Sequence, residues 1–443
     1  MHSLDKIEHE YKTISSWNHS HKKRSLVFYP KNINEVKKFI RLIKRNKKNY
    51  IIKTGACSYG SKSIIADNNT VILSLIRINK IIKINKTNLI VQSGMLISDL
   101  TLEIKDKKIT LFSVPGGSKI SIGGAISANV IGKDSSKKIA SFGDSVNELD
   151  VLTVDGNITK VHTAKELSKY IGGFGFAGII LQANLKIKKI SSNNLAVQSS
   201  YLKNLNEVKK HLDNKISDFT YVILNPFFKK NSFAMAYDAK FVINKKNIFK
   251  KVNLKPYFFE KFLFRLLSYF INKTTWTFFY YLFFYMKNHR KKLVNLHNFY
   301  YESKYKHLIP FITRNGLVEY EVMIKNNFER NINKIINFIQ VNKFNPIYII
   351  IKKLYKSKNK NYNYSFNDNG YAMAISLDRK NLTLFKQKQF LALLNKNNFK
   401  LNFSKTDQKL INKSDNKNFL FLSSYKKMIN NINAISGQRT RNI

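Results

Sequence analysis

Glycine, serine and alanine are concentrated in four short segments of this sequence, and a phosphate group is the ligand that such segments suit. The segments are Gly55-Ala56-Cys57-Ser58-Tyr59-Gly60; Val114-Pro115-Gly116-Gly117-Ser118 with Ile122-Gly123-Gly124-Ala125-Ile126-Ser127-Ala128-Asn129; Gly132-Lys133-Asp134 with Ser141-Phe142-Gly143-Asp144-Ser145-Val146; and Gly172-Gly173-Phe174-Gly175-Phe176-Ala177-Gly178-Ile179-Ile180. Several backbone N–H groups must converge on the oxygens of a pyrophosphate, and small side chains leave room for that approach. Gly123-Gly124-Ala125-Ile126, at the start of an expected helix, would supply such donors at a helix N-terminus.

The glycine distribution divides the chain into two parts. Of 17 glycines, 14 lie between Gly55 and Gly178. A single glycine pair is most often a tight turn, whereas four segments in series indicate a stretch of unusual backbone. No segment is a G-x-G-x-x-G after the first strand and none is a P-loop, so neither a Rossmann nor a P-loop fold is indicated.

Regular elements before and between the segments would position them. A strand over 25–29, a helix over 34–43 and a strand over 50–53 run into the first segment. Ligands of α/β folds bind at the carboxyl ends of strands, where that segment begins. The other predicted elements are strands over 71–74, 81–84, 88–94 and 179–185 and a helix over 97–104.

After about residue 190 the pattern changes to an α+β order, typical of a second domain laid over the first. Strand-like segments at 221–224 and 233–237 alternate with a helix-like segment at 328–340. A length of 443 residues also favours two domains.

Composition bounds the functional classes. The net charge of +50 would suit nucleic acid or an anionic membrane. Lysine, asparagine and isoleucine are nevertheless enriched even in plain surface loops such as 356–361, which favours a compositional bias of the genome, and no nucleic-acid motif is present. The one cysteine, Cys57, allows no internal disulfide and no cysteine-based zinc site, so no metal is expected. The N-terminus lacks a signal-peptide core, and a cytoplasmic location is expected.

Residues 257–286 are rich in aromatic side chains and need testing as a membrane segment. Glu260, Lys261, Arg265 and Lys273 leave an uncharged run of only 274–286. A bilayer-spanning helix needs about 20 apolar residues, so a pair of buried or groove-lining helices is expected. The alternative is an interfacial helix that makes peripheral contact with the inner membrane.

The glycine series resembles the FAD-binding domain of the PCMH-type (vanillyl-alcohol oxidase) superfamily, and looks most like the decaprenylphosphoryl-β-D-ribose 2'-oxidase branch. The motifs that carry the resemblance are Pro115-Gly116, 122–126, Gly132-Lys133, 141–143, 149–156 and 173–180. The similarity runs from Trp17 to the C-terminus, strongly to Lys189 and in patches afterwards. The resemblance implies an α+β fold: a PCMH-type FAD-binding domain of two α/β subdomains over 1–190, an α+β substrate domain over 191–400, and a C-terminal segment, 401–443, that returns to the flavin site.

The resemblance also implies the residues that hold FAD. They are Gly55, Ala56, Cys57, Ser58, Tyr59, Gly60, Pro115, Gly116, Gly117, Gly123, Gly124, Ala125, Ser127, Ala128, Asn129, Gly132, Lys133, Ser141, Gly143, Gly173, Gly175, Gly178 and Ile179. Many relatives carry a histidine bonded to FAD where Cys57 stands, so a histidyl link is excluded and non-covalent FAD is expected. A cysteinyl link through Cys57 is the alternative. Ile131 replaces a family histidine, and a base or flavin-tuning role there does not carry over.

Residues of the second domain are assigned in the same way. Leu317-Val318-Glu319-Tyr320-Glu321-Val322 resembles the substrate-domain strand, although the family favours glutamine at Glu319 and Glu321. Lys353-Leu354-Tyr355 resembles a Lys-Leu-Phe segment, which makes Lys353 a candidate for flavin or substrate phosphate. The 401–407 segment resembles an Ala-Lys-Asp segment and places Lys405 at the flavin, as the catalytic candidate that stabilises reduced anionic flavin or binds a sugar hydroxyl.

The implied activity is FAD-dependent oxidation of a secondary hydroxyl of a polyprenyl-phosphate-linked pentose to a keto sugar, in cell-envelope glycan synthesis. A separate NAD(P)H-dependent reductase would then complete an epimerisation. One alternative is an aldonolactone or alditol oxidase that acts on a soluble sugar. Another is a non-catalytic basic protein that binds nucleic acid or membrane, which predicts no flavin.

Overall fold

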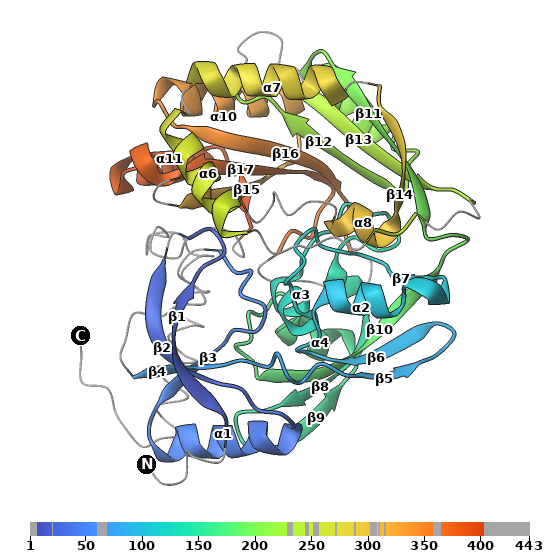
Figure 1. The fold of residues 1–443 in the computed structure, drawn as a ribbon, viewed down its shortest axis with the longest axis vertical. Coiled ribbons are helices and arrows are strands. Elements are labelled where there is room, and N and C mark those ends of the chain that lie inside the picture. The colour runs from blue at the N-terminus through green and yellow to red at the C-terminus, as the bar shows by residue number, and fades with distance from the viewer. Residues whose placement is uncertain are drawn as a thin grey trace.

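The computed structural model consists of two lobes joined along one face (Figure 1). The structure describes residues 7–19, 21–59, 69–227, 234–243, 248–250, 257–270, 273–287, 289–301, 308, 311–313, 316–357 and 365–402. Two sheets built from the first part of the chain make the lower lobe, and one large sheet built from the remainder makes the upper lobe.

The first sheet has the strand order β1-β2-β4-β3. Its strands are β1 (His9–Ser15), β2 (Lys22–Phe28), β3 (Asn49–Ile52) and β4 (Thr70–Leu73). Helix α1 (Ile33–Arg45) covers it, because Val36, Phe39 and Ile43 recur at helical spacing and pack together with Phe28 in one core. Asn32 caps α1 by accepting a hydrogen bond from the Glu35 N–H. The predicted strand–helix–strand unit is thereby confirmed, and β1 was not predicted.

The second sheet has the order β5-β6-β10-β8-β9, with β7 paired to the far end of β10. Its strands are β5 (Ile81–Ile84), β6 (Asn88–Gln92), β7 (Ile109–Leu111), β8 (Val146–Leu152), β9 (Ile158–Val161) and β10 (Ile179–Lys189). Three short helices accompany it: α2 (Ile97–Glu103), α3 (Ile122–Ala128) and α4 (Ala164–Tyr170). Buried aliphatic residues of these strands and helices form one core with α8 (Leu296–Tyr301) of the upper lobe.

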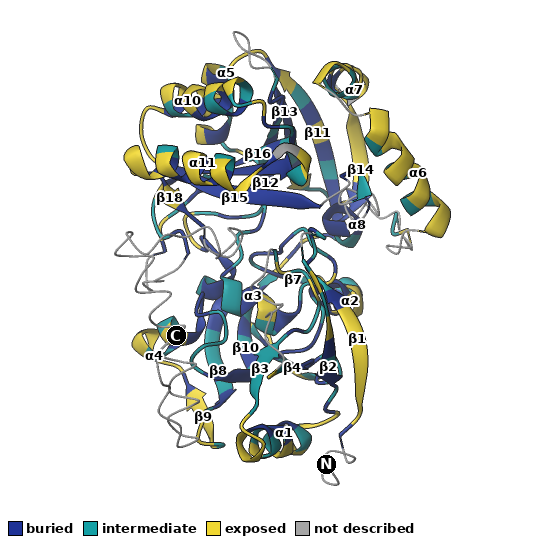
Figure 2. Ribbon diagram, turned by 90° about the vertical axis from the view of Figure 1, so that its left-hand side faces the viewer, coloured by how far each residue is buried: buried dark blue, intermediate teal, exposed yellow. Residues whose placement is uncertain are grey.

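The upper lobe is built on an eight-stranded sheet of order β14-β11-β13-β12-β16-β17-β15-β18. Its strands are β11 (Asn194–Leu202), β12 (Phe219–Leu224), β13 (Ala234–Phe241), β14 (Lys291–Asn295), β15 (Leu317–Ile324), β16 (Pro346–Leu354), β17 (Gly370–Asp378) and β18 (Lys400–Leu401). Helices α5 (Leu205–Asp213), α10 (Phe328–Val341) and α11 (Leu384–Lys396) cover one face. Helices α6 (Phe258–Phe270) and α7 (Lys273–Lys287) lie on the opposite side of the sheet (Figure 2).

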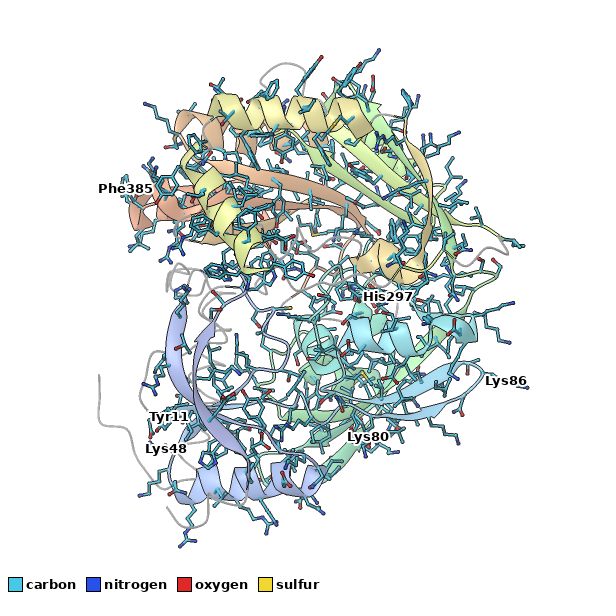
Figure 3. The ribbon with its side chains drawn as sticks, in the orientation of Figure 1. Tyr11, Lys48, Lys80, Lys86, His297 and Phe385 are labelled. Atoms are coloured by element: carbon cyan, nitrogen blue, oxygen red, sulfur yellow. The ribbon has the colours of Figure 1, made fainter. Side chains whose placement is uncertain are left out.

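Direct polar contacts join the lobes, and two of them lie at Asn18 and at His297. Asn18 and Leu317 exchange hydrogen bonds, since the Asn18 side-chain amide donates to the Leu317 carbonyl (2.7 Å) and the Leu317 N–H donates to the Asn18 carbonyl (2.9 Å). His297 of α8 lies between the lobes, with its Nδ1 atom 3.1 Å from the Thr101 hydroxyl of α2 (Figure 3). The two lobes are therefore held together by specific polar contacts as well as by a shared core.

The aromatic segment differs from expectation. Residues 257–286 do form two helices, but no residue of α6 is buried, so the prediction of a buried or groove-lining pair was wrong for α6. Only α7 packs on the sheet, through Tyr280 and Phe284. Among the described residues, no helix has the length and hydropathy needed to cross a membrane.

Candidate functional site

The loop after β3 and the loop after β7 touch through their backbones. A Cβ added to Gly55 would lie 1.5 Å from the Lys119 carbonyl oxygen, so only glycine permits this approach. The Ser58 carbonyl accepts a hydrogen bond from the Trp17 N–H (3.0 Å), which fixes the far end of the first loop. The first and second glycine segments therefore form one continuous wall.

This wall presents unused backbone donors. Among the described residues, the N–H groups of Ala56, Ser58 and Gly117 donate to no other protein atom. Ala56 and Ser58 are exposed, and Ala56 has a φ of 58°, which turns consecutive peptide groups as in anion-binding loops. A pyrophosphate requires several backbone donors on small residues, and the two loops offer such donors, so they fit a phosphate-containing cofactor such as FAD.

Helix α3 does not supply the donors that the sequence predicted. The N–H groups of its first turn are already used: Ile122 donates to the Met95 carbonyl (2.9 Å), and Gly123 to the Ser93 carbonyl (2.8 Å). Gly124 donates to the side chain of the N-cap residue, Ser121. The N-terminus of α3 is therefore a packing element, and the expectation of a helix-terminal phosphate site was wrong.

The third and fourth segments join at the C-terminal end of α3. Gly172 and Phe174 donate backbone hydrogen bonds to the carbonyls of Ile126 (2.9 Å) and Ser127 (3.0 Å). Asn129 ends the helix in the left-handed conformation, and its side-chain oxygen accepts from the Gly143 N–H (2.9 Å). Helix α3, which belongs to the second segment, thus contacts the third and fourth segments, and the first segment touches the loop that precedes α3 at Lys119.

The other predicted cofactor residues fall into two groups. Some hold the loops in place: Gly173 packs against the Lys169 carbonyl, Gly132 donates to the Ser113 hydroxyl, and Gly178 leads into β10 at Ile179. Others leave accessible backbone, because Gly124 is exposed and Gly116, Ser127, Ala128 and Gly175 are half-buried. Pro115, Ala125, Ser141 and Gly143 are buried in the wall behind them, and Gly60 lies outside the described residues.

Two titratable groups lie in the first loop. Burial lowers the pKa of Lys53, the first residue after β3, to about 8. Burial raises the pKa of the Cys57 thiol to about 12, and its Sγ atom lies 3.6 Å from the Gly55 carbonyl. A thiol with so high a pKa is a poor nucleophile at neutral pH, which disfavours a cysteinyl link to the flavin. Lys53 was not among the residues that the sequence singled out.

Lys133 and Asp134 bind the second lobe. The Lys133 amine lies 4.5 Å from the ring centre of Tyr221 and 4.9 Å from that of Phe299. The Asp134 carboxylate accepts hydrogen bonds from the Val114 N–H (3.1 Å) and the Tyr300 hydroxyl (3.3 Å), and burial raises the pKa of Asp134 to about 6. Lys133 therefore makes cation–π contacts between the lobes, and its predicted cofactor role stays a prediction.

A polar row crosses three strands of the upper sheet on the face that α5, α10 and α11 leave uncovered. Glu319 of β15 pairs with Ser376 of β17, which lies opposite Tyr348 of β16. The Glu319 carboxylate accepts from the Ser376 hydroxyl (2.8 Å) and the Tyr348 hydroxyl (3.1 Å). Burial, together with the nearby Glu319 carboxylate, raises the pKa of Tyr59 well above its usual value. The loop after β3 therefore reaches the upper sheet at Glu319.

Neighbouring residues extend the row along β15. Glu321 accepts a hydrogen bond from the Asn402 side chain (2.5 Å), and the described chain ends at Asn402, so Lys405 lies outside the described residues.

Lys353 is placed differently from expectation. It donates to Asp213 of α5 (2.5 Å) on the helix-covered face, which is against a role in binding substrate or flavin. Its neighbour Lys352 instead reaches the lower lobe, where it donates to the Ile131 carbonyl (3.4 Å).

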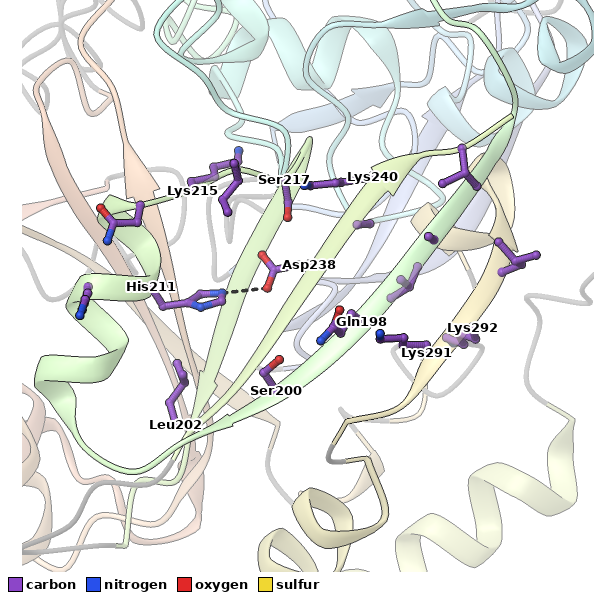
Figure 4. Close-up of a pocket in the computed structure, with 18 of the residues that line it drawn as sticks. Gln198, Ser200, Leu202, His211, Lys215, Ser217, Asp238, Lys240, Lys291 and Lys292 are labelled. Carbon is purple, nitrogen blue, oxygen red and sulfur yellow. Dashed lines mark hydrogen bonds and ion pairs between the residues drawn. The ribbon is translucent and has the colours of Figure 1, made fainter. Parts of the chain in front are cut away.

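A separate cavity of about 870 Å³ lies beside α5, between β11, β13 and β14 (Figure 4). His211 lies 2.8 Å from the Asp238 carboxylate, which also accepts from the Thr220 hydroxyl (2.8 Å). Lys210, Lys215, Lys240, Lys291 and Lys292 contribute to its walls. Because Asp238 and Thr220 lie on the helix-covered face, this cavity is distinct from the polar row, and no sequence pattern had indicated it.

Comparisons with known proteins agree with this geometry. Residues 25–162 match the family described as FAD binding domain. Over 113 residues the chain is 27% identical to decaprenylphosphoryl-beta-D-ribose oxidase of Mycolicibacterium smegmatis, a match that covers 24% of this chain and 24% of that protein. The chain thus spans about a quarter of the length of this curated relative.

Solved structures match over nearly the whole chain. The structure of Physcomitrella patens BBE-like 1 superposes with a TM-score of 0.65 at 12% identity, over 96% of this chain and 94% of that one. A variant of the same protein gives a TM-score of 0.66 at 11% identity, over 96% and 95%. At these identities the likeness shows the fold, which includes the upper lobe that the family match does not reach.

Proposed function

We propose that the chain is an FAD-dependent oxidoreductase that oxidises a secondary hydroxyl of a sugar to a ketone. The match of residues 25–162 to an FAD binding domain and the likeness of the fold to that of BBE-like 1 support this proposal. Non-covalent FAD would supply the two-electron oxidant, which receives hydride from the carbinol carbon. The observation that carries the proposal is the approach of Tyr59, from the first flavin loop, to Glu319 in the polar row of the substrate sheet.

The protein's own groups have distinct parts in this reaction. The backbone donors of Ala56, Ser58 and Gly117 would hold the cofactor phosphates. Tyr59 is protonated at neutral pH, and its hydroxyl donates to the Glu319 carboxylate and so would hold that carboxylate in position beside the substrate. The Glu319 carboxylate accepts hydrogen bonds from Ser376 and Tyr348, and we assign it as the acceptor of the hydroxyl proton. The sugar loses one hydride and one proton, and the C–O single bond becomes a carbonyl.

The substrate class that we propose is a polyprenyl-phosphate-linked pentose of cell-envelope glycan synthesis. The partial match to decaprenylphosphoryl-beta-D-ribose oxidase supports it. The keto product would then pass to an NAD(P)H-dependent reductase. We place the enzyme in the cytoplasm, with access to the inner face of the membrane, where such substrates reside.

The test begins with the visible spectrum of the purified protein before and after acid precipitation. A flavin spectrum that is released into the supernatant is expected, whereas a protein that is colourless and takes up no added FAD would overturn the proposal. Anaerobic mixing with polyprenyl-phosphoryl pentose should then bleach the flavin absorbance within the turnover time. Bleaching by free alditols or aldonolactones, but not by the lipid-linked sugar, would replace the substrate proposed here with a soluble one.

A further inference from the structure

Helices α6 and α7 present a large apolar surface to the outside of the molecule. In the described part of the chain, most of the large hydrophobic side chains that remain exposed belong to 257–286, with Phe258 84% and Tyr285 75% exposed. Monomeric soluble proteins rarely expose a contiguous apolar patch of this kind without a partner. Figure 2 shows both helices on the same side of the upper lobe.

On a water-facing surface a helix turns its apolar side inward, whereas α6 turns most of its apolar residues outward. Its half-buried residues are Glu260, Lys261, Phe264 and Ser268, which form one stripe at helical spacing. Apart from Arg265, the exposed residues of the helix are apolar or aromatic: Phe258, Phe259, Phe262, Leu263, Leu266, Leu267, Tyr269 and Phe270. Lys261 and Arg265 also lie near enough to His19 of the lower lobe to help burial lower its pKa. Three of the four residues that face the protein are thus polar, whereas the outward side is apolar except for Arg265.

Helix α7 fixes this surface to the sheet. On its inner side Tyr280 and Phe284 pack against Met235, and the Tyr280 hydroxyl (2.9 Å) and the Trp276 indole N–H (2.8 Å) both donate to the Ile347 carbonyl. Its outer side carries a second group of exposed aromatic and aliphatic residues: Phe278, Phe279, Tyr281, Leu282, Tyr285 and Met286. A helix that is apolar all round, yet anchored on one side only, requires apolar surroundings on its other side.

Charge indicates what covers the surface. Between Tyr257 and Lys292 the only acidic residue is Glu260, whereas the basic residues are Lys261, Arg265, Lys273, Lys287, Arg290, Lys291 and Lys292. Two copies of the chain that met through this surface would bring like charges together. An anionic lipid surface would instead attract these cations, while the tyrosine, tryptophan and phenylalanine side chains enter the head-group region.

We propose that α6 and α7 form a docking surface for an anionic lipid bilayer, on which the protein lies without crossing it. Because α7 is anchored at Ile347, next to Tyr348 of the polar row, docking places the substrate sheet directly behind the lipid-bound helices. The inference concerns binding alone and does not depend on the reaction proposed above. Its failure would leave that reaction standing.

The test uses full-length FAD-loaded protein, purified without detergent, in flotation with two kinds of vesicle. Vesicles of phosphatidylcholine with phosphatidylglycerol should carry the protein upward, vesicles of phosphatidylcholine alone should carry less, and added salt should weaken binding. The triple variant Phe259→Ser/Phe262→Ser/Leu266→Ser alters only exposed side chains of α6. It should bind anionic vesicles roughly tenfold more weakly or worse, with unchanged flavin content.

The matched control is Leu384→Ser/Phe385→Ser on α11, where both side chains are exposed and Phe385 points away from the body of the molecule (Figure 3). It should bind vesicles as the wild type does. Wild-type protein that stays at the bottom of the gradient, or an α6 variant that floats like the control, would overturn the proposal. So would a wild-type dimer that the α6 substitutions convert to monomer without any vesicle binding, because a second copy would then be the occupant.

Discussion

The side-chain amide of Asn129 donates a hydrogen bond to the hydroxyl of Ser365, 2.8 Å away and 236 positions later in the chain. Both side chains are buried, and the other end of the same amide accepts from the Gly143 N–H. One residue therefore ends α3, holds the third glycine segment and fastens the upper lobe.

Replacing Asn129 should weaken both the flavin site and the contact between the lobes. Asn129→Ala removes the hydrogen bond that the Gly143 N–H donates to the Asn129 side chain and places alanine at a φ of 43°, at a combined cost of about 2–4 kcal/mol. Ser365→Ala removes only the inter-lobe bond and should cost less. Urea unfolding and bound flavin would be measured for both variants. Equal losses would show that the hydrogen bond to Gly143 adds nothing.

Adding a methyl group to Gly55 should abolish flavin binding. Its Cβ would overlap the Lys119 carbonyl, so the loops that carry Ala56 and Gly117 must separate. Gly156→Asn is a suitable control, because no atom lies within 4 Å of its Cβ position and asparagine tolerates its positive φ. We expect colourless Gly55→Ala protein beside a yellow control. Full flavin in Gly55→Ala would show that the two loops do not form the cofactor wall.

Lys53 should make stability depend on pH in the alkaline range. Its pKa falls from 10.5 to about 8 on folding, so the unfolded chain binds more protons between these values and the free energy of unfolding rises with pH across that window. Below pH 8 the buried lysine carries a cost of about 3 kcal/mol. For Lys53→Met, the free energy of unfolding from urea titrations of the flavin-free protein should change less between pH 8 and 10.5 than it does for the wild type. An unchanged slope would show that Lys53 is not the source.

Lys53 should also respond to the cofactor. A phosphate beside the first loop would favour the charged amine and raise the pKa of Lys53 towards its usual value. Flavin should therefore stabilise the wild type more than Lys53→Met at pH 7, a difference that thermal melts with and without FAD would measure. Equal stabilisation of the two proteins would place the phosphates away from Lys53.

Asp134 should act with the opposite sign and at lower pH. Its pKa rises from 3.8 to about 6 on folding, so the native state binds more protons in that range and the free energy of unfolding falls as pH rises from 4 to 6. Asp134→Asn keeps an oxygen acceptor for the Val114 N–H and cannot titrate. The wild type should lose roughly 2–3 kcal/mol more than the variant between pH 4 and 6 in urea unfolding. Parallel curves would contradict the prediction.

Glu319 should matter for turnover far more than Glu321, which lies two residues along the same face. Glu319→Gln removes the proposed proton acceptor and should slow flavin reduction by about 100-fold or more, with flavin content unchanged. Glu321→Gln keeps an oxygen for Asn402 and should slow reduction much less. Stopped-flow absorbance would give both rates. If Glu321→Gln slowed flavin reduction more than Glu319→Gln, Glu321 and not Glu319 would be the proton acceptor.

Much of this fold could be predicted from sequence because its signals are local. The apolar spacing of Val36, Phe39 and Ile43 predicts α1, and the glycine segments predict where the cofactor wall lies. Which N–H groups remain unused there depends on tertiary partners: the carbonyls of Met95 and Ser93 occupy the start of α3, and no local pattern indicates them.

The rest of the site could not be predicted, because it depends on register and on faces. Lys352 and Lys353 are adjacent in β16 and therefore point to opposite sides of the sheet, so an error of one position exchanges a residue facing the lower lobe for one facing α5. Ser376 and Tyr348 join Glu319 only through pairing between strands that are distant in sequence. The amphipathic pattern of α6 does not reveal that its apolar half faces outward.

The cation–π contacts of Lys133 with Tyr221 and Phe299 limit how the two lobes can be exchanged, in engineering or in evolution. The contacts between the lobes are complementary. The lower lobe supplies the Lys133 cation for two aromatic rings of the upper lobe, and the upper lobe supplies the Leu317 carbonyl for the Asn18 amide of the lower lobe. In a chimaera that joins the upper lobe of a relative to this lower lobe, Lys133 would lose its aromatic partners unless the grafted lobe also carried aromatic residues at the positions of Tyr221 and Phe299. Exchange of substrate specificity by whole-domain recombination is therefore disfavoured, and change confined to the polar row is the easier route.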